Sequence, residues 1–304
     1  MSTQVYDRFK DFDKSHCWQY EVRLQNLEED LEELGITKEQ VSQLRIEDFD
    51  FSYVDSTDKE QCLEIKQFIQ RHEWLGKLPN RPTHRFVARL NGTIAGAIIM
   101  AIPNSFSHLL GKENMDKEKL ISRGASISWA PKNLGSWLIM NSIRWMVQNT
   151  DFRVFTAYSD PEAKELGTIY QSCNFIYLGQ TSGTNKQYFD PEHPERGWFS
   201  DRDFRKKSKY RIYAENIGIS KDQWKAWMKK WSPNWDIIPE DIKKKIKKEE
   251  RTYRESCLSR PVPPKHKYCY ILGTNKKETK QFKKIFEQNN LKLVNLSYPK
   301  RRGE

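Results

Sequence analysis

The chain has 304 residues, 31% of them charged, and a formal net charge of +11; this length is ample for a packed core in one large domain or two. Five scattered cysteines without a Cys-x-x-Cys pair argue against a disulfide framework and a structural zinc site. No apolar run approaches the roughly 18 residues of a membrane span and no signal-peptide pattern opens the chain, so we expect an intracellular protein that does not contact membranes.

The charge is unevenly distributed. From Lys186 onward there are 31 Lys and Arg against 16 Asp and Glu, a net charge of +15, whereas the first 185 residues carry 21 basic and 25 acidic side chains, a net charge of −4. The basic half is the electrostatic candidate for binding a polyanion such as nucleic acid. A basic surface can equally serve solubility alone, so charge by itself leaves both interpretations open.

The first part of the chain predicts a helical arm, residues 1–48, and the start of a sheet. In the arm helix leucines at positions 24, 27, 31 and 34 share one face, and Gly35 is placed as the C-cap. Asn91-Gly92 is a hairpin signal, because a type I′ turn needs positive φ at both positions. The expected elements are a helix over 17–34, a strand over 49–54, a helix over 58–74, and strands over 85–90 and 93–102.

The middle of the chain predicts an α/β arrangement. The expected elements are a strand over 121–129, a helix over 136–148, a strand over 152–158, a helix over 162–173 and a strand over 175–179. We interpret residues 49–185 as a catalytic core, a mixed sheet with helices on both faces.

The last part of the chain predicts an insertion and a return to the sheet. We interpret residues 186–264 as a basic helical insertion, and residues 265–304 as a strand, a helix and a strand that complete the core. The expected elements are helices over 201–217, 221–231 and 239–254, a strand over 268–273, a helix over 276–288 and a strand over 291–296.

The turn before the helix at Ser136 is a candidate anion site. A helix start exposes free N–H groups and the positive end of its dipole, which together suit a pyrophosphate. The alternative is an ordinary turn between a strand and a helix. The candidate cofactor-binding residues are Lys132, Asn133, Gly135 and Ser136.

Asp160 and Tyr170 are candidates for proton transfer. Asp160 closes a predicted strand at its carboxyl end, where ligands collect in such sheets. A phenol with a pKa near ~10 is protonated at neutral pH and can deliver a proton to a departing thiolate or alkoxide. The alternative for Tyr170 is a half-buried tyrosine that is hydrogen-bonded to a neighbouring strand.

His72 and Arg123 are further candidates. Imidazole, carboxylate and phenolate are reasonable iron ligands, so His72 with Asp160 and Tyr170 could form a mononuclear metal site, although no short-range spacing supports it. Arg123 could clamp an anion or a carboxamide, or could simply form a salt bridge at the end of its strand.

Aromatic and basic residues alternate in the insertion. Trp224, Trp227, Trp231 and Trp235 could stack on bases, but the first three fall on one helical face, which favours packing inside the protein. Basic side chains are better candidates for contacts with DNA. The candidates are Arg205, Lys206, Lys207, Lys225, Lys229, Lys243 and Lys244.

Three runs of the sequence carry a family resemblance: Arg123-Gly-Ala-Ser-Ile-Ser-Trp-Ala-Pro-Lys-Asn-Leu-Gly-Ser136, Tyr158-Ser-Asp160, and Leu166-Gly-Thr-Ile-Tyr-Gln-Ser-Cys-Asn-Phe-Ile-Tyr-Leu-Gly179. They resemble bacteriophage Mom-type DNA modification proteins, a divergent branch of the GNAT acetyltransferase superfamily. The most specific piece is Tyr-Gln-Ser-Cys-Asn-Phe, which is similar to Tyr-x-x-x-Gly-Phe of acetyltransferases. The closing Tyr298-Pro-Lys-Arg301 adds to the resemblance.

The resemblance implies a GNAT-like fold and an enzyme that converts adenine in double-stranded phage DNA to N6-carbamoylmethyladenine in the cytoplasm of the infected host, which protects that DNA from restriction. His72, Arg123, Ser136, Asp160 and Tyr170 match the family's polar positions. Because the exocyclic amine is paired in duplex DNA, we expect the base to be extruded.

The resemblance is incomplete in the cofactor loop. The usual GNAT loop, Gln/Arg-x-x-Gly-x-Gly/Ala, is replaced by Trp-Ala-Pro-Lys-Asn-Leu-Gly135-Ser136, which argues against acetyl-CoA as the donor. Acyl transfer gives N–C(=O), whereas a carbamoylmethyl group is joined through N–CH2. Iron held by His72, Asp160 and Tyr170 would supply the missing reactivity, with Tyr170 as a ligand or radical-stabilising phenol.

Two alternatives stay open beside a DNA-modifying transferase. One is an N-acetyltransferase that uses acetyl-CoA on a protein or small-molecule amine. The other is a nucleic-acid-binding protein without enzymatic activity. The identity of the small-molecule donor and the choice between a monomer and a homodimer are not determined by the sequence.

Overall fold

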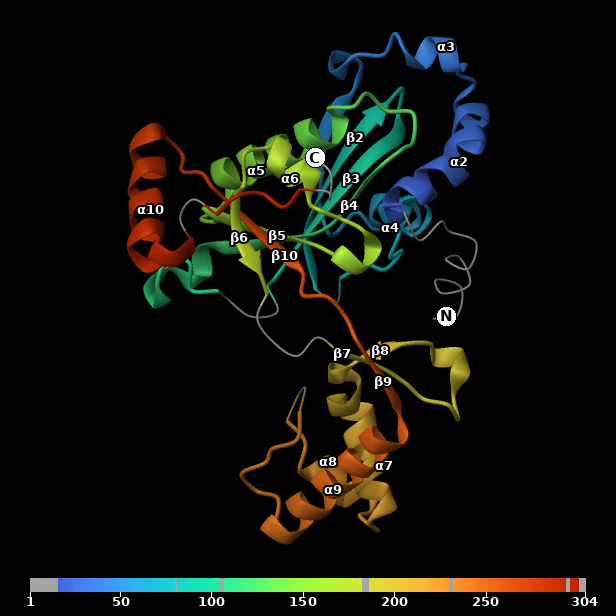
Figure 1. The fold of residues 1–304 in the computed structure, drawn as a ribbon, viewed down its shortest axis with the longest axis vertical. Coiled ribbons are helices and arrows are strands. Elements are labelled where there is room, and N and C mark those ends of the chain that lie inside the picture. Colours follow the sequence, from blue (N-terminus) through green and yellow to red (C-terminus); the bar gives the residue numbers. More distant parts are fainter. Residues whose placement is uncertain are drawn as a thin grey trace. The chain divides into compact units, whose positions relative to one another are not determined.

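The computed structural model describes residues 16–79, 81–103, 107–181, 186–229, 232–293 and 296–300, which divide into two compact units (Figure 1). The sheet unit takes its described residues from Asp11–Ser182 and Pro264–Glu304, and the insertion unit takes them from Gly183–Pro263. In the described part of the chain, no helix combines the length and apolar character needed to cross a bilayer.

The sheet unit is built on seven strands in the order β1-β2-β3-β4-β5-β10-β6. Only β4 and β5 pair in parallel, and the other neighbours are antiparallel. The strands are β1 (Asp50–Val54), β2 (Pro82–Leu90), β3 (Thr93–Ala101), β4 (Glu118–Ser126), β5 (Val154–Ser159), β6 (Ile176–Gln180) and β10 (His266–Ile271). The α-helices are α2 (Trp18–Leu34), α3 (Lys38–Val41), α4 (Lys59–His72), α5 (Leu134–Asn149), α6 (Thr168–Ser172) and α10 (Lys276–Asn289).

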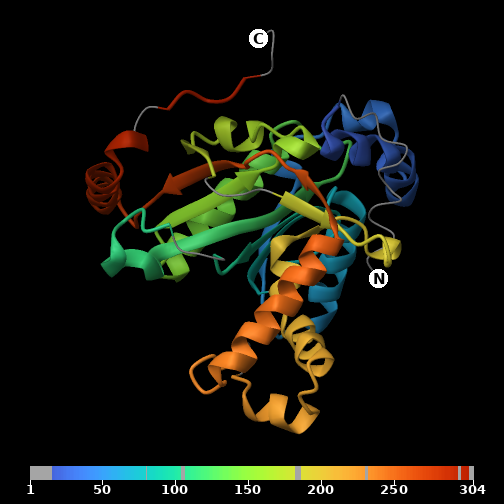
Figure 2. The same ribbon diagram turned by 60° about the horizontal axis from the view of Figure 1, so that its bottom comes forward.

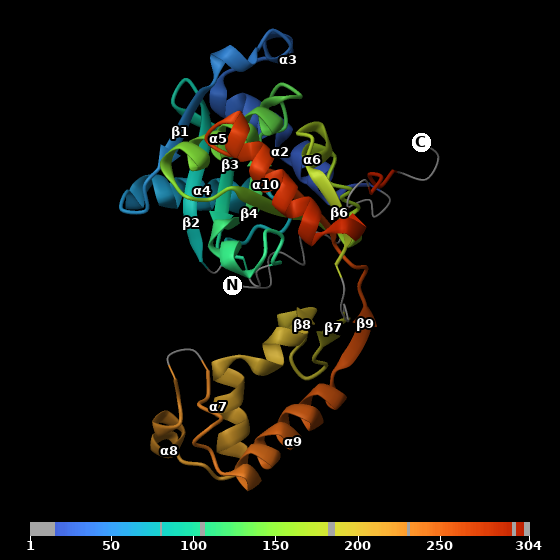
Figure 3. The ribbon, with the colours of Figure 1, turned by 90° about the vertical axis from the view of Figure 1, so that its left-hand side faces the viewer.

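The core of the sheet unit lies around β3, which is buried along eight of its nine residues. A strand buried on both of its faces requires cover on both sides of the sheet. On one side, Trp145 of α5 stacks on Tyr53 with ring centroids 4.1 Å apart. Apolar side chains of α4, such as Ile65 and Ile69, join the same core. Figure 3 shows α10 along the sheet unit, where Phe286 is 2% exposed.

The strands β4 and β5 separate soon after they begin. They pair only between Glu118–Leu120 and Val154–Thr156. Beyond this point β4 continues alongside β3, and β5 continues alongside β10. The facing edges of β4 and β5 therefore lack a ladder toward their carboxyl ends, and this opening is where Arg123 and Asp160 lie.

The insertion unit has its own sheet and core. Its elements are β7 (Lys186–Phe189), β8 (Phe199–Ser200), β9 (Leu258–Pro261), α7 (Lys207–Asn216), α8 (Lys221–Ala226) and α9 (Glu240–Ser256), with strand order β8-β7-β9. Figure 2 shows α7 and α9 side by side. The core is aromatic: Trp224 is 3% exposed, and Trp227 and Trp235 are partly buried against the same cluster. Packing therefore explains these three tryptophans, while Trp231 lies outside the described residues.

Most predicted elements are present, with three corrections. The helix predicted over 162–173 is a 3₁₀ turn at Pro161–Ala163 and then the short α6, because Gly167 between them has φ +68°. The strand predicted over 291–296 is a 3₁₀ turn at Leu291–Leu293, and residues 294 and 295 lie outside the described parts. Leu24, predicted on the buried face of α2, is 48% exposed, because Asn26 and Asp30 occupy that face and bond to Arg71.

Gly167 has a second constraint besides its positive φ. A Cβ atom there would lie 2.5 Å from a ring carbon of Tyr268. We predict that Gly167→Ala lowers the free energy of unfolding by about 3 kcal/mol, from backbone strain plus the clash. The control Gly92→Ala has a similar φ of +86° and open space around it, so it costs about 1 kcal/mol. Urea unfolding checks both, and equal losses would contradict the role of the Tyr268 contact.

Candidate functional site

Polar side chains from separate segments meet near the opening between β4 and β5. We call this group the glutamate site. Four of its members, Glu73, Trp74, Glu165 and Lys265, were not singled out by the sequence analysis. The members are Glu73 and Trp74 after α4, Arg123 on β4, Asp160 and Glu165 between β5 and α6, Tyr170 on α6, and Lys265 before β10.

Glu165 is held by two hydrogen-bond donors. The indole Nε1–H of Trp74 donates to Oε1 at 3.0 Å, and the backbone N–H of Asp160 donates to Oε2 at 3.1 Å. Both oxygens are therefore fixed in position. The Trp74 bond also joins the end of α4 to the loop after β5, because the two residues are 91 positions apart in the sequence.

Glu73 is the more buried of the two residues, with 7% of its surface exposed. Its Oε1 lies 3.5 Å from Nε of Arg123. Its Oε2 is buried and accepts no hydrogen bond from the described residues. A buried carboxylate oxygen without a donor is costly, so this atom is a candidate for receiving a proton or a ligand donor.

Both glutamates titrate near neutral pH. Burial is the main reason that the pKa of Glu73 is raised to about 7; Arg123 opposes the shift, and the carboxylate of Glu165 adds to it. Burial likewise raises the pKa of Glu165 to about 7, against the hydrogen bond from the Asp160 backbone. A carboxyl with such a pKa can both take up and release a proton at neutral pH, which is what general acid–base catalysis requires.

Tyr170 lies within the electrostatic reach of both glutamates. Burial raises the pKa of the Tyr170 phenol well above its ordinary value, and the carboxylates of Glu165 and Glu73 raise it further. Its ring lies between those of Phe175 and Tyr268, with centroids 5.4 Å and 5.5 Å away. The phenol is therefore neutral at physiological pH and carries a proton.

Asp160 and Arg123 are anchored by neighbours. One carboxylate oxygen of Asp160 lies 2.7 Å from Nζ of Lys265, and the other accepts the backbone N–H of Glu162 at 3.1 Å. Arg123 donates through Nε to the carbonyl of Lys77 at 2.6 Å. The structure thus brings Arg123 and Tyr170 to the two glutamates, and it brings Asp160 to Glu165 through its backbone.

His72 has a different environment. Its ring packs on Phe68 with centroids 4.4 Å apart, and its Nε2 lies 3.7 Å from Oδ1 of Asp30 on α2. The backbone carbonyl of His72 accepts a hydrogen bond from Gln19. These contacts place His72 at the packing of α2 on α4.

The residues present do not fit the predicted iron site of His72, Asp160 and Tyr170. The His72 ring faces Asp30, the Asp160 carboxylate is engaged by Lys265, and a Tyr170 phenolate is disfavoured beside two carboxyls. Among the residues that the structure describes, no group of three or more His, Cys, Asp or Glu could hold a metal ion. His72, Asp160 and Tyr170 therefore do not form the predicted iron site.

The predicted cofactor residues lie around the start of α5: Lys132 and the N-cap Asn133 precede the helix, and Gly135 and Ser136 are in its first turn. Lys132 and Asn133 are exposed, and the Asn133 side chain makes no capping hydrogen bond. The Ser136 hydroxyl donates to the carbonyl of Asn133 at 3.0 Å. Gly135 faces α6, because a Cβ atom there would lie 2.8 Å from Cδ1 of Ile169. Gly135 therefore has a packing role between α5 and α6.

The predicted DNA-binding side chains of the insertion unit fall into two groups. Four form ion pairs within that unit: Arg205 with Asp201, Lys206 with Asp203, Lys229 with Asp236, and Lys243 with Glu240. Lys207, Lys225 and Lys244 are exposed and form no ion pair with a described residue. The second group offers positive charge that is not already neutralised.

In a comparison with protein families, the model of the Mom protein family matches residues 53–300. The chain belongs to the Mom protein family. The predicted Mom-type family is therefore confirmed, and the structure confirms the predicted mixed central sheet with flanking helices. A comparison with curated protein sequences finds no match.

Solved structures of acetyltransferases are similar to this Mom family member. An aminoglycoside acetyltransferase from an uncultured soil metagenomic sample is 15% identical, with a TM-score of 0.36 and coverage of 45% of this chain and 94% of the other. The ribosomal-protein-S5-alanine acetyltransferase of Vibrio fischeri is 13% identical, with a TM-score of 0.33 and coverage of 45% and 85%. The ribosomal-protein-S18-alanine N-acetyltransferase of Escherichia coli is 14% identical, with a TM-score of 0.32 and coverage of 47% and 86%.

We predict that Glu73→Gln removes a pH-dependent loss of stability. Between the unfolded pKa near ~4.3 and the folded pKa of about 7, the native Glu73 binds more protons than the unfolded chain, so wild-type stability falls as pH rises. The stability gap between Glu73→Gln and wild type should widen from about pH 5 to pH 7 and then level off, at on the order of 2 kcal/mol.

Urea unfolding at several pH values checks this prediction. Glu64→Gln on α4 is the control, because Glu64 forms its ion pair with Arg89 and has a 44% exposed side chain. Its stability gap should stay flat over the same window. A flat gap for Glu73→Gln as well would contradict the raised pKa of Glu73.

Proposed function

We propose that this Mom family member transfers a carbamoylmethyl group to N6 of adenine in double-stranded phage DNA, in the cytoplasm of the infected host. The observation that carries the proposal is the family match across residues 53–300, which takes in both the glutamate site and the insertion unit. The basic insertion unit supports a DNA substrate, since residues 186–263 hold 20 Lys and Arg against 13 Asp and Glu.

The glutamate site supports a transfer in which the adenine N6 loses one proton and the leaving group of the donor receives another. In the proposed reaction, the N6 lone pair attacks the methylene carbon of a carbamoylmethyl donor, and the donor's leaving group departs with the bonding electrons. N6 then has to lose one proton. Glu73 or Glu165 accepts that proton, since each has a carboxyl whose pKa lies near neutrality.

In this proposal, Tyr170 donates a proton to the leaving group. Its phenol is kept neutral by burial and by the neighbouring carboxyls, so it holds a proton that it can donate. Arg123 is placed beside Glu73 and is suited to bind the carboxamide oxygen of the transferred group. Asp160, fixed by Lys265, orients the loop that carries Glu165.

Adenine N6 is paired inside the duplex, so the proposal includes extrusion of the base. The energetic cost of unstacking is a few kcal/mol, which backbone contacts by basic side chains can offset. Lys207, Lys225 and Lys244 are proposed to make such contacts, because no described acidic side chain pairs with them.

N-acetyl transfer from acetyl-CoA is the second candidate. It is favoured by the opening between β4 and β5 and by the first turn of α5, where the Asn133 side chain makes no capping hydrogen bond. In that reaction Tyr170 would protonate the CoA thiolate. The product would carry an amide N–C(=O) in place of N–CH2, so the two products differ in mass.

We predict that DNA from cells expressing the wild-type protein contains N6-carbamoylmethyladenine, detected by nucleoside mass spectrometry. Tyr170→Phe and Glu165→Gln should each reduce the modified fraction about 100-fold or more, because each removes a proton-transfer group. Tyr20→Phe, at a residue 54% exposed on α2, is the matched control and should leave the product unchanged.

Each outcome separates the candidate functions. Acetylated adenosine, or acetylation of a protein or small amine without DNA modification, would favour acetyl transfer. DNA that stays unmodified under adequate expression, and is the same with Tyr170→Phe or Asp160→Ala, would overturn the proposal. That result would favour a nucleic-acid-binding protein without enzymatic activity.

A second prediction concerns DNA binding by the insertion unit. Lys207→Gln, Lys225→Gln and Lys244→Gln combined should weaken binding to a DNA duplex and reduce the salt slope by about 2 to 3, since each free lysine can neutralise one phosphate. Arg205→Gln, Lys206→Gln and Lys229→Gln combined should have a smaller effect, because their charges are already offset by Asp201, Asp203 and Asp236. Fluorescence anisotropy across salt concentrations checks this, and the reverse order would contradict it.

A further inference from the structure

The helix α10 exposes a row of lysines on the sheet unit. Phe286 is buried beneath this helix, and Phe282 and Ile285 are partly buried against the same apolar cluster. At 100° per residue, the lysines fall on the side opposite to these apolar residues. They are Lys276, Lys277, Lys280, Lys283 and Lys284, all of them exposed, and we call them the lysine face.

Among the residues that the structure describes, acidic side chains do not neutralise the lysine face. Glu278 turns away from it, to Nε of Arg153 at 2.9 Å and to the Thr274 hydroxyl at 2.6 Å. The other acidic residue of α10 is Glu287, in the last turn. No lysine of α10 forms an ion pair with a residue that the structure describes. A helix face that serves only solubility usually mixes basic and acidic side chains. The lysine face does not have this mixture.

The charge is also segregated along the chain that builds the sheet unit. Residues 264–304 hold 11 Lys and Arg against 3 Asp and Glu, a net charge of +8, whereas the first 185 residues have a net charge of −4. Solubility alone would not require this separation. A local positive patch on an otherwise acidic unit fits a partner that is itself strongly negative.

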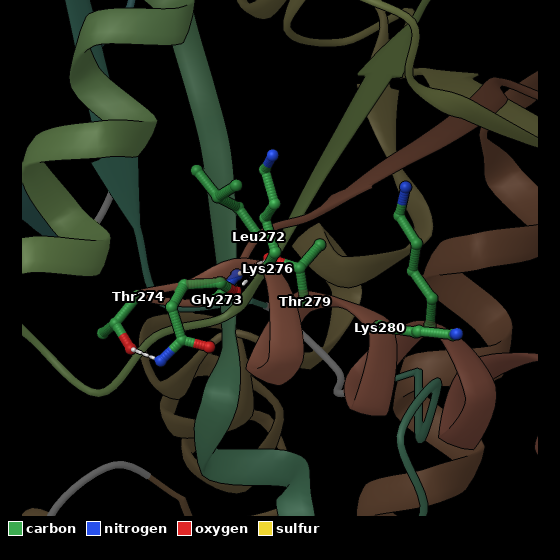
Figure 4. A pocket seen from close by; sticks show the side chains of 8 residues that line it. Leu272, Gly273, Thr274, Lys276, Thr279 and Lys280 are labelled. Atoms are coloured by element: carbon green, nitrogen blue, oxygen red, sulfur yellow. Dashed lines mark hydrogen bonds between the residues drawn. The ribbon is translucent and has the colours of Figure 1, made fainter.

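Three of these lysines surround a hollow at the start of α10. The hollow has a volume of about 560 Å³ and is lined by residues 272–276 together with Thr279, Lys280 and Lys283. Figure 4 shows the side chains of Lys276 and Lys280 extending from the first turns of the helix. The N–H of Glu278 is capped by the Asn275 side chain, and the N–H of Thr274 is bonded to the Glu278 carboxylate. The lysines are therefore the groups that an anion would meet here.

We propose that the lysine face of α10 binds the sugar–phosphate backbone of DNA, as a contact surface on the sheet unit that is separate from the insertion unit. The inference rests on the proposed function and names how the sheet unit itself holds its substrate. Lys276 and Lys283 are about 10 Å apart along the helix. Duplex DNA presents about one negative charge per 1.7 Å of its axis, so a row of this length meets several phosphates.

The test is duplex binding across salt concentrations, measured by fluorescence anisotropy on the full chain. In Lys276→Glu/Lys280→Glu/Lys283→Glu we expect binding to weaken at least tenfold and the salt slope to fall by about 2 to 3. The matched control is Lys38→Glu/Lys59→Glu/Lys66→Glu, which makes the same change in net charge at three exposed lysines of α3 and α4. It should change affinity less than threefold.

Further controls address folding. The neutral variant Lys276→Gln/Lys280→Gln/Lys283→Gln should lie between wild type and the charge reversal, and thermal unfolding followed by circular dichroism should be the same for all variants. Equal weakening by both charge reversals would show a general charge effect and would overturn the inference.

The outcomes also separate this inference from the proposed function. Wild-type protein that modifies adenine, with a charge-reversed lysine face that leaves duplex binding unchanged, overturns only the role of α10. Wild-type protein that neither binds the duplex nor modifies adenine overturns both.

Discussion

The separation of β4 from β5 is the constraint on which the candidate site depends. Three paired positions, ending at Leu120 and Thr156, hold the two strands together in parallel. Beyond them each strand is stabilised by a different antiparallel neighbour, β3 or β10. The ladder between β3 and β4 shifts register between Ile99 and Met100, opposite Arg123 and Ile121, just past the point where the parallel pairing ends. The backbone of the sheet thus fixes the opening, and the side chains of the loops around it decide what chemistry takes place there.

The two glutamates lie near this opening, and removing their carboxylates from water costs free energy. A carboxylate that leaves water loses solvation, and Glu73 recovers only part of that loss through Arg123, at 3.5 Å. Glu165 recovers more, because Trp74 and the Asp160 backbone both donate to it. A site selected for stability alone would carry apolar residues at these positions. Two carboxyls poised near neutral pH are instead the arrangement expected where protons are transferred.

The sequence predicts the elements of the sheet unit well because its signals are local. Asn91 and Gly92 have positive φ, as their turn requires, and Gly35 ends α2 in the left-handed region. The helix predicted over 162–173 fails because Gly167 is held by contact with Tyr268, a residue 101 positions away. The strand predicted over 291–296 has the apolar pattern of a strand, but Leu291–Leu293 form a 3₁₀ turn next to β6. Non-local packing overrides the pattern in both places.

The same distinction explains the site residues. Asp160 and Tyr170 can be selected from the sequence because the family motifs name them. Glu73 carries no motif, and its importance comes from burial and from Arg123, which is 50 positions away. Glu165 has one weak signal, a position five residues from both Asp160 and Tyr170. His72 shows the converse error. Its residue type suits metal binding and led to the prediction of a ligand, but its ring packs against Phe68 and lies near Asp30.

The placement of the insertion explains how the core tolerates it. The insertion leaves the sheet after β6 and returns before β10, and these two strands pair with each other. Two hydrogen bonds close its base: Thr181 N–H donates to the Lys265 carbonyl at 2.8 Å, and Lys265 N–H donates to the Thr181 hydroxyl at 3.1 Å. The side chain of the same Lys265 holds Asp160. With a half-exposed side chain, that ion pair adds little to stability, so its main effect is positional. The hydrogen bond that Lys265 accepts and the one that it donates at Thr181, and the ion pair that its side chain forms with Asp160, are therefore all made by one residue of the sheet unit.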